Sequence, residues 1–92
     1  MEFLVQMSVS LPANLSAADL QELYQKEIAR GKELRESGVI QRMWRIPGTR
    51  NNAGIWVADD ATALHEYISS LPLFAYITAT VTALAAHPLE AM

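Results

Sequence analysis

The chain has 92 residues, of which 51% are hydrophobic and 18% are charged, with a net charge of −3 and no cysteine. The length predicts a single domain over residues 1–92. The scattered Lys and Arg exclude the clustered basic surface that nucleic-acid binding needs, and the absence of cysteine excludes disulfides and thiolate metal sites. The apolar fraction exceeds what one small core buries, so we expect a homo-oligomer.

The first predicted element is a strand over residues 2–10, where apolar and polar side chains alternate with the period of two that strands show. A helix then begins after Ser16, whose side chain can cap the first turn, and runs to about Ser37. Gly38 follows as the residue that most easily takes the left-handed conformation at a helix end.

A hairpin and a second helix are predicted next. Residues 39–46 and 53–58 have the pattern of strands, and the segment between them is rich in Pro, Gly and Asn, as turns are. Asp60 can cap a helix over residues 61–70, whose apolar side chains recur with helical spacing.

A last strand is predicted over residues 77–84, again from alternation. The order β-α-β-β-α-β is typical of a ferredoxin-like α+β fold, an antiparallel four-stranded sheet with both helices on one face. The other face would be bare unless a second copy covered it. No segment reaches the roughly 20 apolar residues of a membrane span, and the N-terminal segment lacks signal-peptide features, so we expect a cytoplasmic protein without membrane partners.

Glu27 is the charged residue that lies in the middle of the apolar side of the first predicted helix. At about 100° per residue it falls between Leu20 and Leu34, and Gly31 lies one turn away on the same face. Burial would raise the pKa of the carboxyl toward neutrality, which suits a general base. Gly31 would leave room for a ligand beside it.

Spacing alone leaves two interpretations of Glu27. It is either a proton-transferring group or part of a structural ion pair, with Arg45 or Arg42 as partner or across a subunit interface. Arg45 also has two interpretations, because its guanidinium could bind either a substrate carboxylate or the carboxylate of Glu27. Tyr24 lies on the same helix face and is a candidate substrate-binding residue.

Other candidates have weaker context. Asn52 could donate a hydrogen bond to a developing oxyanion, or it could be a turn residue. His65 lies at the edge of the second helix's apolar stripe and could carry a proton, bind an anion or be structural. Trp44, Phe74 and Tyr76 could line a small apolar pocket or belong to the core. The two histidines lie far apart with no ligand-spaced cluster, so we expect no metal site.

Short motifs are distributed along the whole chain in a distinctive order. They are a helix with Glu27 that ends at Gly38, Trp44-Arg45-Ile46 with Gly48 and then Asn52, Leu64-His65, Leu71-Pro72-Leu73-Phe74 with Tyr76, and His87-Pro88. With this order and spacing the chain resembles the muconolactone delta-isomerase family, which includes chloromuconolactone dehalogenases.

The resemblance implies a ferredoxin-like protomer, dimers of the α/β-barrel type formed through the sheets, a closed homodecamer, and active sites shared between subunits without metal or organic cofactor. It implies isomerisation of muconolactone to 3-oxoadipate enol-lactone in the β-ketoadipate pathway of aromatic hydrocarbon catabolism. Glu27 would be the single general base. Arg45 or His65 would hold the substrate's carboxylate, and Asn52 would help with the lactone oxygen.

Two alternatives remain beside the isomerase. One is a chloromuconolactone dehalogenase, in which the same deprotonation by Glu27 is followed by chloride elimination to dienelactone. The other is a non-catalytic ligand-binding assembly protein on the same fold.

The chain departs from the family pattern at several positions. The family usually has a tyrosine where this chain has Arg50, an acidic residue at Val57, a proline at Ala75 and often an aromatic residue at Ile40. The resemblance thus implies a retained scaffold and base and leaves the identity of the substrate open. Arg50 could favour a more anionic substrate or chloride departure, or it could be a solvated loop residue.

Overall fold

The computed structural model describes residues 1–91, so the last residue of the predicted domain lies outside it. Its elements are β1 (Glu2–Val9), α1 (Ala17–Glu36), β2 (Ile40–Arg45), β3 (Asn52–Val57), α2 (Ala61–Ser69) and β4 (Ile77–Leu84), with short 3-10 helices at Phe74–Tyr76 and Pro88–Ala91. Every predicted strand and helix is present, with ends that differ by about one residue, within the usual uncertainty of such boundaries.

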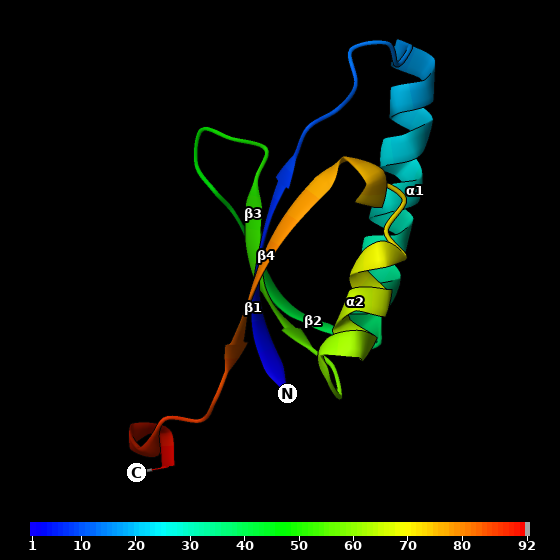
Figure 1. Ribbon diagram of the computed structural model, residues 1–92. Coiled ribbons are helices and arrows are strands. Elements are labelled where there is room, and N and C mark those ends of the chain that lie inside the picture. Colours follow the sequence, from blue (N-terminus) through cyan, green and yellow to red (C-terminus); the bar gives the residue numbers. More distant parts are fainter. Residues whose placement is uncertain (92) are drawn as a thin grey trace.

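The four strands form one antiparallel sheet in the order β2-β3-β1-β4. Both helices lie on the same side of this sheet (Figure 1). The ferredoxin-like α+β prediction is therefore confirmed. The core lies between the sheet and the helices, and its fully buried side chains come from all layers; among them are Val5, Leu34, Trp56 and Leu64.

The ends of the helices form as the sequence predicts. The Ser16 side chain accepts a hydrogen bond from the backbone N–H of Asp19 at 3.1 Å, and Asp60 accepts one from Ala63 at 2.7 Å. Gly38 has a φ of +86°, in the left-handed region that favours glycine. The two side-chain caps mark where α1 and α2 begin, and Gly38 marks where α1 ends and the chain turns into β2.

The strand register decides which side chains face the helices. Arg45 pairs with Asn52, and Trp44 pairs with Ala53, so consecutive residues of β2 point to opposite faces. Arg45 and Asn52 lie on the helix side, as Asn52 also pairs with the buried Met7. Trp44 lies on the uncovered face, where it is 46% exposed.

Two parts of the chain are less closely packed than the rest. Ile28 lies on the apolar side of α1 by sequence, yet it is 58% exposed. The C-terminal 3-10 helix lies away from the body of the protein, at the end of β4 (Figure 1). Among residues 1–91, no helix has the length and apolar character that crossing a membrane would require.

Candidate active site

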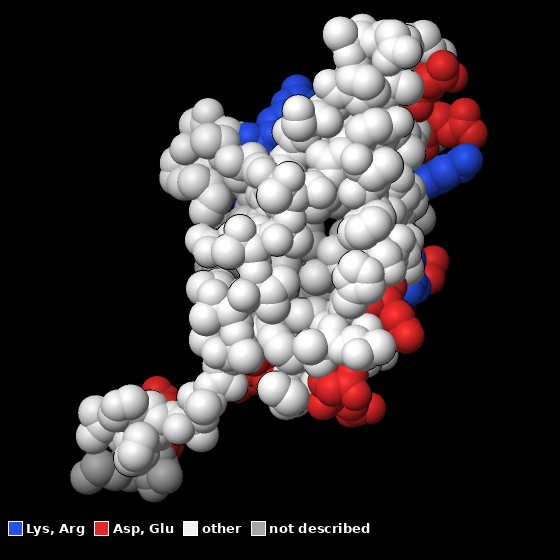
Figure 2. Space-filling view, viewed as in Figure 1, with Lys and Arg blue, Asp and Glu red and all other residues white. Residues whose placement is uncertain are grey.

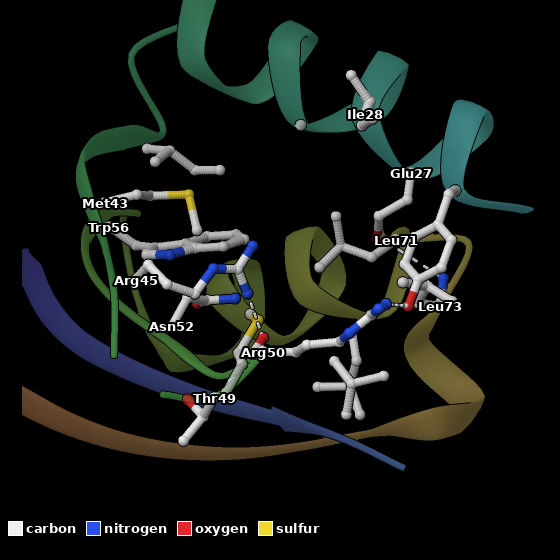
Figure 3. Close-up of a pocket in the computed structure, with 16 residues that line it drawn as sticks. Glu27, Ile28, Met43, Arg45, Thr49, Arg50, Asn52, Trp56, Leu71 and Leu73 are labelled. Atoms are coloured by element: carbon white, nitrogen blue, oxygen red, sulfur yellow. Dashed lines mark hydrogen bonds between the residues drawn. The ribbon is translucent and has the colours of Figure 1, made fainter. Parts of the chain in front are cut away.

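A cavity of about 520 Å³ lies between α1, the β2–β3 hairpin and the segment that follows α2 (Figure 3). This volume is in the range that small-molecule sites occupy. One wall comes from α1, with Tyr24, Glu27, Ile28 and Gly31. The opposite wall comes from the hairpin, and apolar side chains of β1 and of residues 71–77 complete the enclosure.

Glu27 points from α1 into this cavity (Figure 3). Its Oε1 accepts a hydrogen bond from the backbone N–H of Leu73 at 3.3 Å. Its Oε2 is buried and has no hydrogen-bond partner within residues 1–91. Burial raises the pKa of the Glu27 carboxyl above its ordinary value, and the hydrogen bond from Leu73 partly opposes this rise. A desolvated carboxylate with one unpaired oxygen can accept a proton from a bound ligand.

An ion pair between Glu27 and an arginine of the same chain does not form. The two ion pairs found in residues 1–91 both join other residues within α1. Arg42 instead places its guanidinium 5.0 Å from the centre of the Trp44 ring, on the uncovered face of the sheet. Arg45 donates a hydrogen bond to the backbone carbonyl of Arg50. The interpretation of Glu27 as half of an intrachain ion pair is therefore wrong.

The hairpin wall holds two guanidinium groups. Arg45 extends from the end of β2 beside the Trp56 ring, and Arg50 reaches from the loop between the strands toward α1 (Figure 3). The Arg50 Nη1 donates a hydrogen bond to the Tyr24 hydroxyl at 3.1 Å, which bridges the two walls. The loop is fixed by a hydrogen bond from the Thr49 hydroxyl to the Ile46 carbonyl at 2.8 Å. Arg50 thus lines the cavity and is not merely a solvated loop residue.

Two neutral polar groups of β3 complete the hairpin wall. Asn52 Oδ1 and Trp56 Nε1 are both buried without a hydrogen-bond partner among residues 1–91. Gly54 lies between them on the same face of the strand. A Cβ there would lie 2.7 Å from the Arg42 carbonyl oxygen and 3.4 Å from Trp56 Nε1, so the close approach of β2 requires glycine. Unpaired buried polar atoms in a cavity wall are typical of groups that serve a ligand.

Trp56 is one of several residues that line the cavity without having been predicted as site residues. The signal was available, because Asn52, Gly54 and Trp56 have the strand period of two and must share a face. A tryptophan on a strand fits the pattern of a core residue, and its indole N–H can also serve as a hydrogen-bond donor. It does fill the core, with 1% of its surface exposed, and it also contributes to the cavity wall.

The predicted site residues divide into two groups. Tyr24, Glu27, Arg45 and Asn52 line the cavity, and Gly31 leaves the predicted room, because a Cβ there would meet nothing within 4 Å. The second group does not line the cavity of the single chain and comprises Trp44, His65, Phe74 and Tyr76. The His65 and Phe74 rings pack edge to face instead, with centroids 6.0 Å apart. A role for these four in a site shared between subunits stays a prediction.

Comparison with known proteins identifies the family. The sequence pattern of the family described as Muconolactone delta-isomerase matches residues 1–90. The chain belongs to this family. It is 36% identical to Muconolactone Delta-isomerase 2 of Acinetobacter lwoffii over 87 residues, which are 95% of this chain and 91% of the relative. It is also 36% identical to Muconolactone Delta-isomerase of Cupriavidus pinatubonensis over 88 residues, 96% of each chain.

Solved structures agree with this assignment. A crystal structure of muconolactone isomerase superposes with a TM-score of 0.88 at 33% identity, covering 96% of this chain and 92% of that one. The fold is shared by 5-chloro-2-hydroxyhydroquinone dehydrochlorinase from Burkholderia phenoliruptrix, with a TM-score of 0.68 at 16% identity over 95% and 96% of the chains. This member of the family is therefore an enzyme of the isomerase or related dehalogenase type. Its residues 1–91 contain no group of three or more His, Asp or Glu side chains arranged to hold a metal ion.

Proposed function

We propose that the enzyme catalyses a cofactor-free proton shift in an unsaturated lactone, the isomerisation of muconolactone to 3-oxoadipate enol-lactone. The observation that carries the proposal is Glu27. It is the one carboxylate among the described residues that line the cavity, its pKa is raised by burial, and its Oε2 is unpaired. The names of the curated relatives supply the substrate.

One carboxyl group suffices for this reaction. Glu27 removes the proton from the ring carbon that bears the carboxymethyl group, and the electron pair moves through the conjugated ring to the lactone carbonyl oxygen. The resulting dienolate takes the same proton back from Glu27 at the carbon next to the carbonyl, two carbons away on the same ring face. The double bond moves, no atom is gained or lost, and the Leu73 N–H holds the carboxyl in place throughout.

The hairpin wall binds the substrate in this proposal. The Arg45 guanidinium holds the carboxylate of the carboxymethyl arm, for which its planar fork is suited. Asn52 contacts the oxygen atoms of the lactone. Tyr24 forms part of the wall beside Glu27. His65 is the alternative carboxylate ligand, and it would have to act from a neighbouring subunit, since it lies outside the cavity of its own chain.

We also propose that the enzyme is a homo-oligomer built from dimers, a decamer in its closed form, acting in the cytoplasm within the β-ketoadipate pathway. The uncovered sheet face carries the half-exposed Trp44, and Leu89 of the outlying C-terminal helix is 67% exposed. Figure 2 shows a broad surface of uncharged side chains, with acidic side chains gathered along the outer side of the helices. Light scattering that finds a monomer at micromolar concentration would contradict shared sites.

The test of the reaction is direct. Incubation with muconolactone should change the ultraviolet spectrum to that of the enol-lactone, and proton NMR in D₂O should show part of the original hydrogen retained at the carbon next to the carbonyl. A parallel incubation uses 5-chloromuconolactone. Dienelactone and free chloride from this compound, with no turnover of muconolactone, would replace the isomerase by the dehalogenase. Binding of both lactones without turnover of either would identify a non-catalytic binding protein.

A further inference from the structure

The cavity contains more positive charge than binding the carboxylate of the substrate requires. Arg45 and Arg50 both line it, and neither forms an ion pair with a carboxylate within residues 1–91. Their described hydrogen bonds go to a backbone carbonyl and to a tyrosine hydroxyl, which are neutral. Muconolactone in its ground state carries one carboxylate, so one guanidinium is enough to bind it.

The second negative charge arises during the reaction. When Glu27 takes the proton, its own charge disappears and an equal charge appears on the dienolate. The intermediate thus has two negative charges, one on the carboxymethyl arm and one on the ring oxygens. Two guanidinium groups match these two charges. A fixed cation at the place where charge develops lowers the barrier more than a neutral donor such as Asn52 does.

The positions of the two arginines distinguish their tasks. Arg50 bonds to Tyr24, which precedes Glu27 by three residues on the same face of α1, so its guanidinium lies on the Glu27 side of the cavity. In Figure 3 the Arg45 guanidinium lies toward Trp56, on the side of the view away from Tyr24. The reacting ring must contact Glu27, whereas the carboxymethyl arm can extend away from it. Arg50 is therefore placed near the ring and Arg45 near the arm.

Arg50 is also held in place before substrate binds. Its backbone carbonyl accepts the hydrogen bond from Arg45, and its guanidinium is tied to α1 through Tyr24. It makes no ion pair with Glu27 within residues 1–91, although both residues line the same cavity. A donor that is positioned in advance needs no reorganisation when the charge appears.

We propose that Arg50, positioned by Tyr24, is a catalytic residue that stabilises the negative charge on the lactone oxygen of the dienolate, while Arg45 binds the substrate's carboxylate. This inference rests on the proposed lactone isomerisation. It gives the loop arginine a role in the chemical step and separates it from the residues that determine ground-state affinity.

Steady-state kinetics with muconolactone test the proposal. Arg50→Gln should lower kcat by about 10- to 100-fold with little change in KM, because the lost interaction forms only as charge develops. Arg50→Lys, which keeps the charge without the fork, should recover a large part of this loss. Lys32→Gln removes the same unit charge from the exposed side of α1 and should leave both constants unchanged. A change confined to KM in Arg50→Gln, or an unchanged kcat, would overturn the proposal.

A binding experiment separates failure of this inference from failure of the proposed function. The probes are a saturated lactone with a carboxymethyl arm, whose ring is neutral, and a tetronate with the same arm, whose ionised ring shares its charge with the lactone carbonyl oxygen. Calorimetry should show that Arg50→Gln weakens tetronate binding about tenfold or more and changes lactone binding little. Equal effects on both probes would refute the role of Arg50. Absence of muconolactone turnover by the unaltered enzyme would instead refute the proposed isomerisation, whatever the two probes show.

Discussion

The two walls of the cavity differ in composition and in the chemistry they support. The α1 wall is largely apolar and contributes a single carboxylate, that of Glu27. The hairpin wall contributes two guanidinium groups and the unpaired polar atoms of Asn52 and Trp56. The two arginines thus come from the wall opposite Glu27, and Arg50 reaches across to Tyr24 without forming an ion pair with Glu27 within residues 1–91.

This separation has an electrostatic consequence. A guanidinium in contact with Glu27 would lower the pKa of its carboxyl and neutralise it as part of an ion pair. Among residues 1–91 the described contact of the Glu27 carboxylate is the backbone N–H of Leu73, so burial prevails and the pKa is raised. The Glu27 carboxylate would accept a proton less readily if an arginine of the hairpin were in contact with it.

The largest effect is expected when the α1 wall loses its carboxylate. Glu27→Gln keeps the shape of the side chain and removes the base, so kcat for muconolactone should fall by about 100- to 10,000-fold, the usual contribution of general acid–base catalysis. Stopped-flow or steady-state absorbance measures this change. Glu22→Gln, an exposed residue of the same helix, is the matched control and should keep full activity. A loss smaller than about tenfold would mean that Glu27 is not the base.

A different kind of loss is expected on the hairpin wall. Arg45→Gln should raise KM for muconolactone and lower kcat/KM by about 10- to 100-fold, because a charge-assisted hydrogen bond to the carboxylate is lost in the ground state and the transition state alike. Added salt should weaken substrate binding by the unaltered enzyme and affect the variant less. If Arg45→Gln lowers kcat with unchanged KM, the assignments of Arg45 and Arg50 must be exchanged.

The sequence predicted the elements well because its local signals agree with one another. The Ser16 and Asp60 caps, the left-handed Gly38 and the alternation along β1 all lie where the structure has them. Glu27 was found for the same reason, since a carboxylate on an apolar helix face is conspicuous. Each of these signals is contained within about one turn of helix or one strand.

The hairpin wall could not be predicted as a whole because it depends on contacts between distant segments. The bond from Arg50 to Tyr24 spans 26 positions, and Arg45 points to the carbonyl of a loop whose path the sequence does not specify. Trp44 was predicted as a possible pocket residue, and it lies on the opposite face of the sheet. Trp56 was not among the predicted site residues, and a buried tryptophan on a strand by itself fits the pattern of a core residue.

A smaller effect is expected on the pH dependence of stability, and it would show that the Glu27 carboxyl of the α1 wall is desolvated. The folded pKa of this carboxyl is raised above its ordinary value of 4.5, so the native state binds the proton more tightly than the unfolded state. Stability should therefore be lost as pH rises from about 4.5 through the folded pKa. Glu27→Gln removes this dependence and should be increasingly more stable than the unaltered enzyme over that range.

Urea unfolding at several pH values and one protein concentration measures the difference. Glu22→Gln again controls for the loss of one negative charge on α1. If Glu27→Gln instead loses stability relative to the unaltered protein as pH rises, the pKa of Glu27 is lower in the folded state than in the unfolded state. Burial would then not dominate the environment of this carboxyl.

The smallest effect is expected at Gly31, where the α1 wall leaves space beside the base. Alanine should raise the free energy of unfolding by about 0.5–1 kcal/mol, because glycine inside a helix is costly and a Cβ here meets nothing within 4 Å. Activity should hardly change. Leucine at the same position would extend into the cavity and should lower kcat/KM while the helix remains intact. If alanine abolished activity, the substrate would pack directly against the α1 backbone; if leucine left activity unchanged, the space beside Glu27 would not be part of the site.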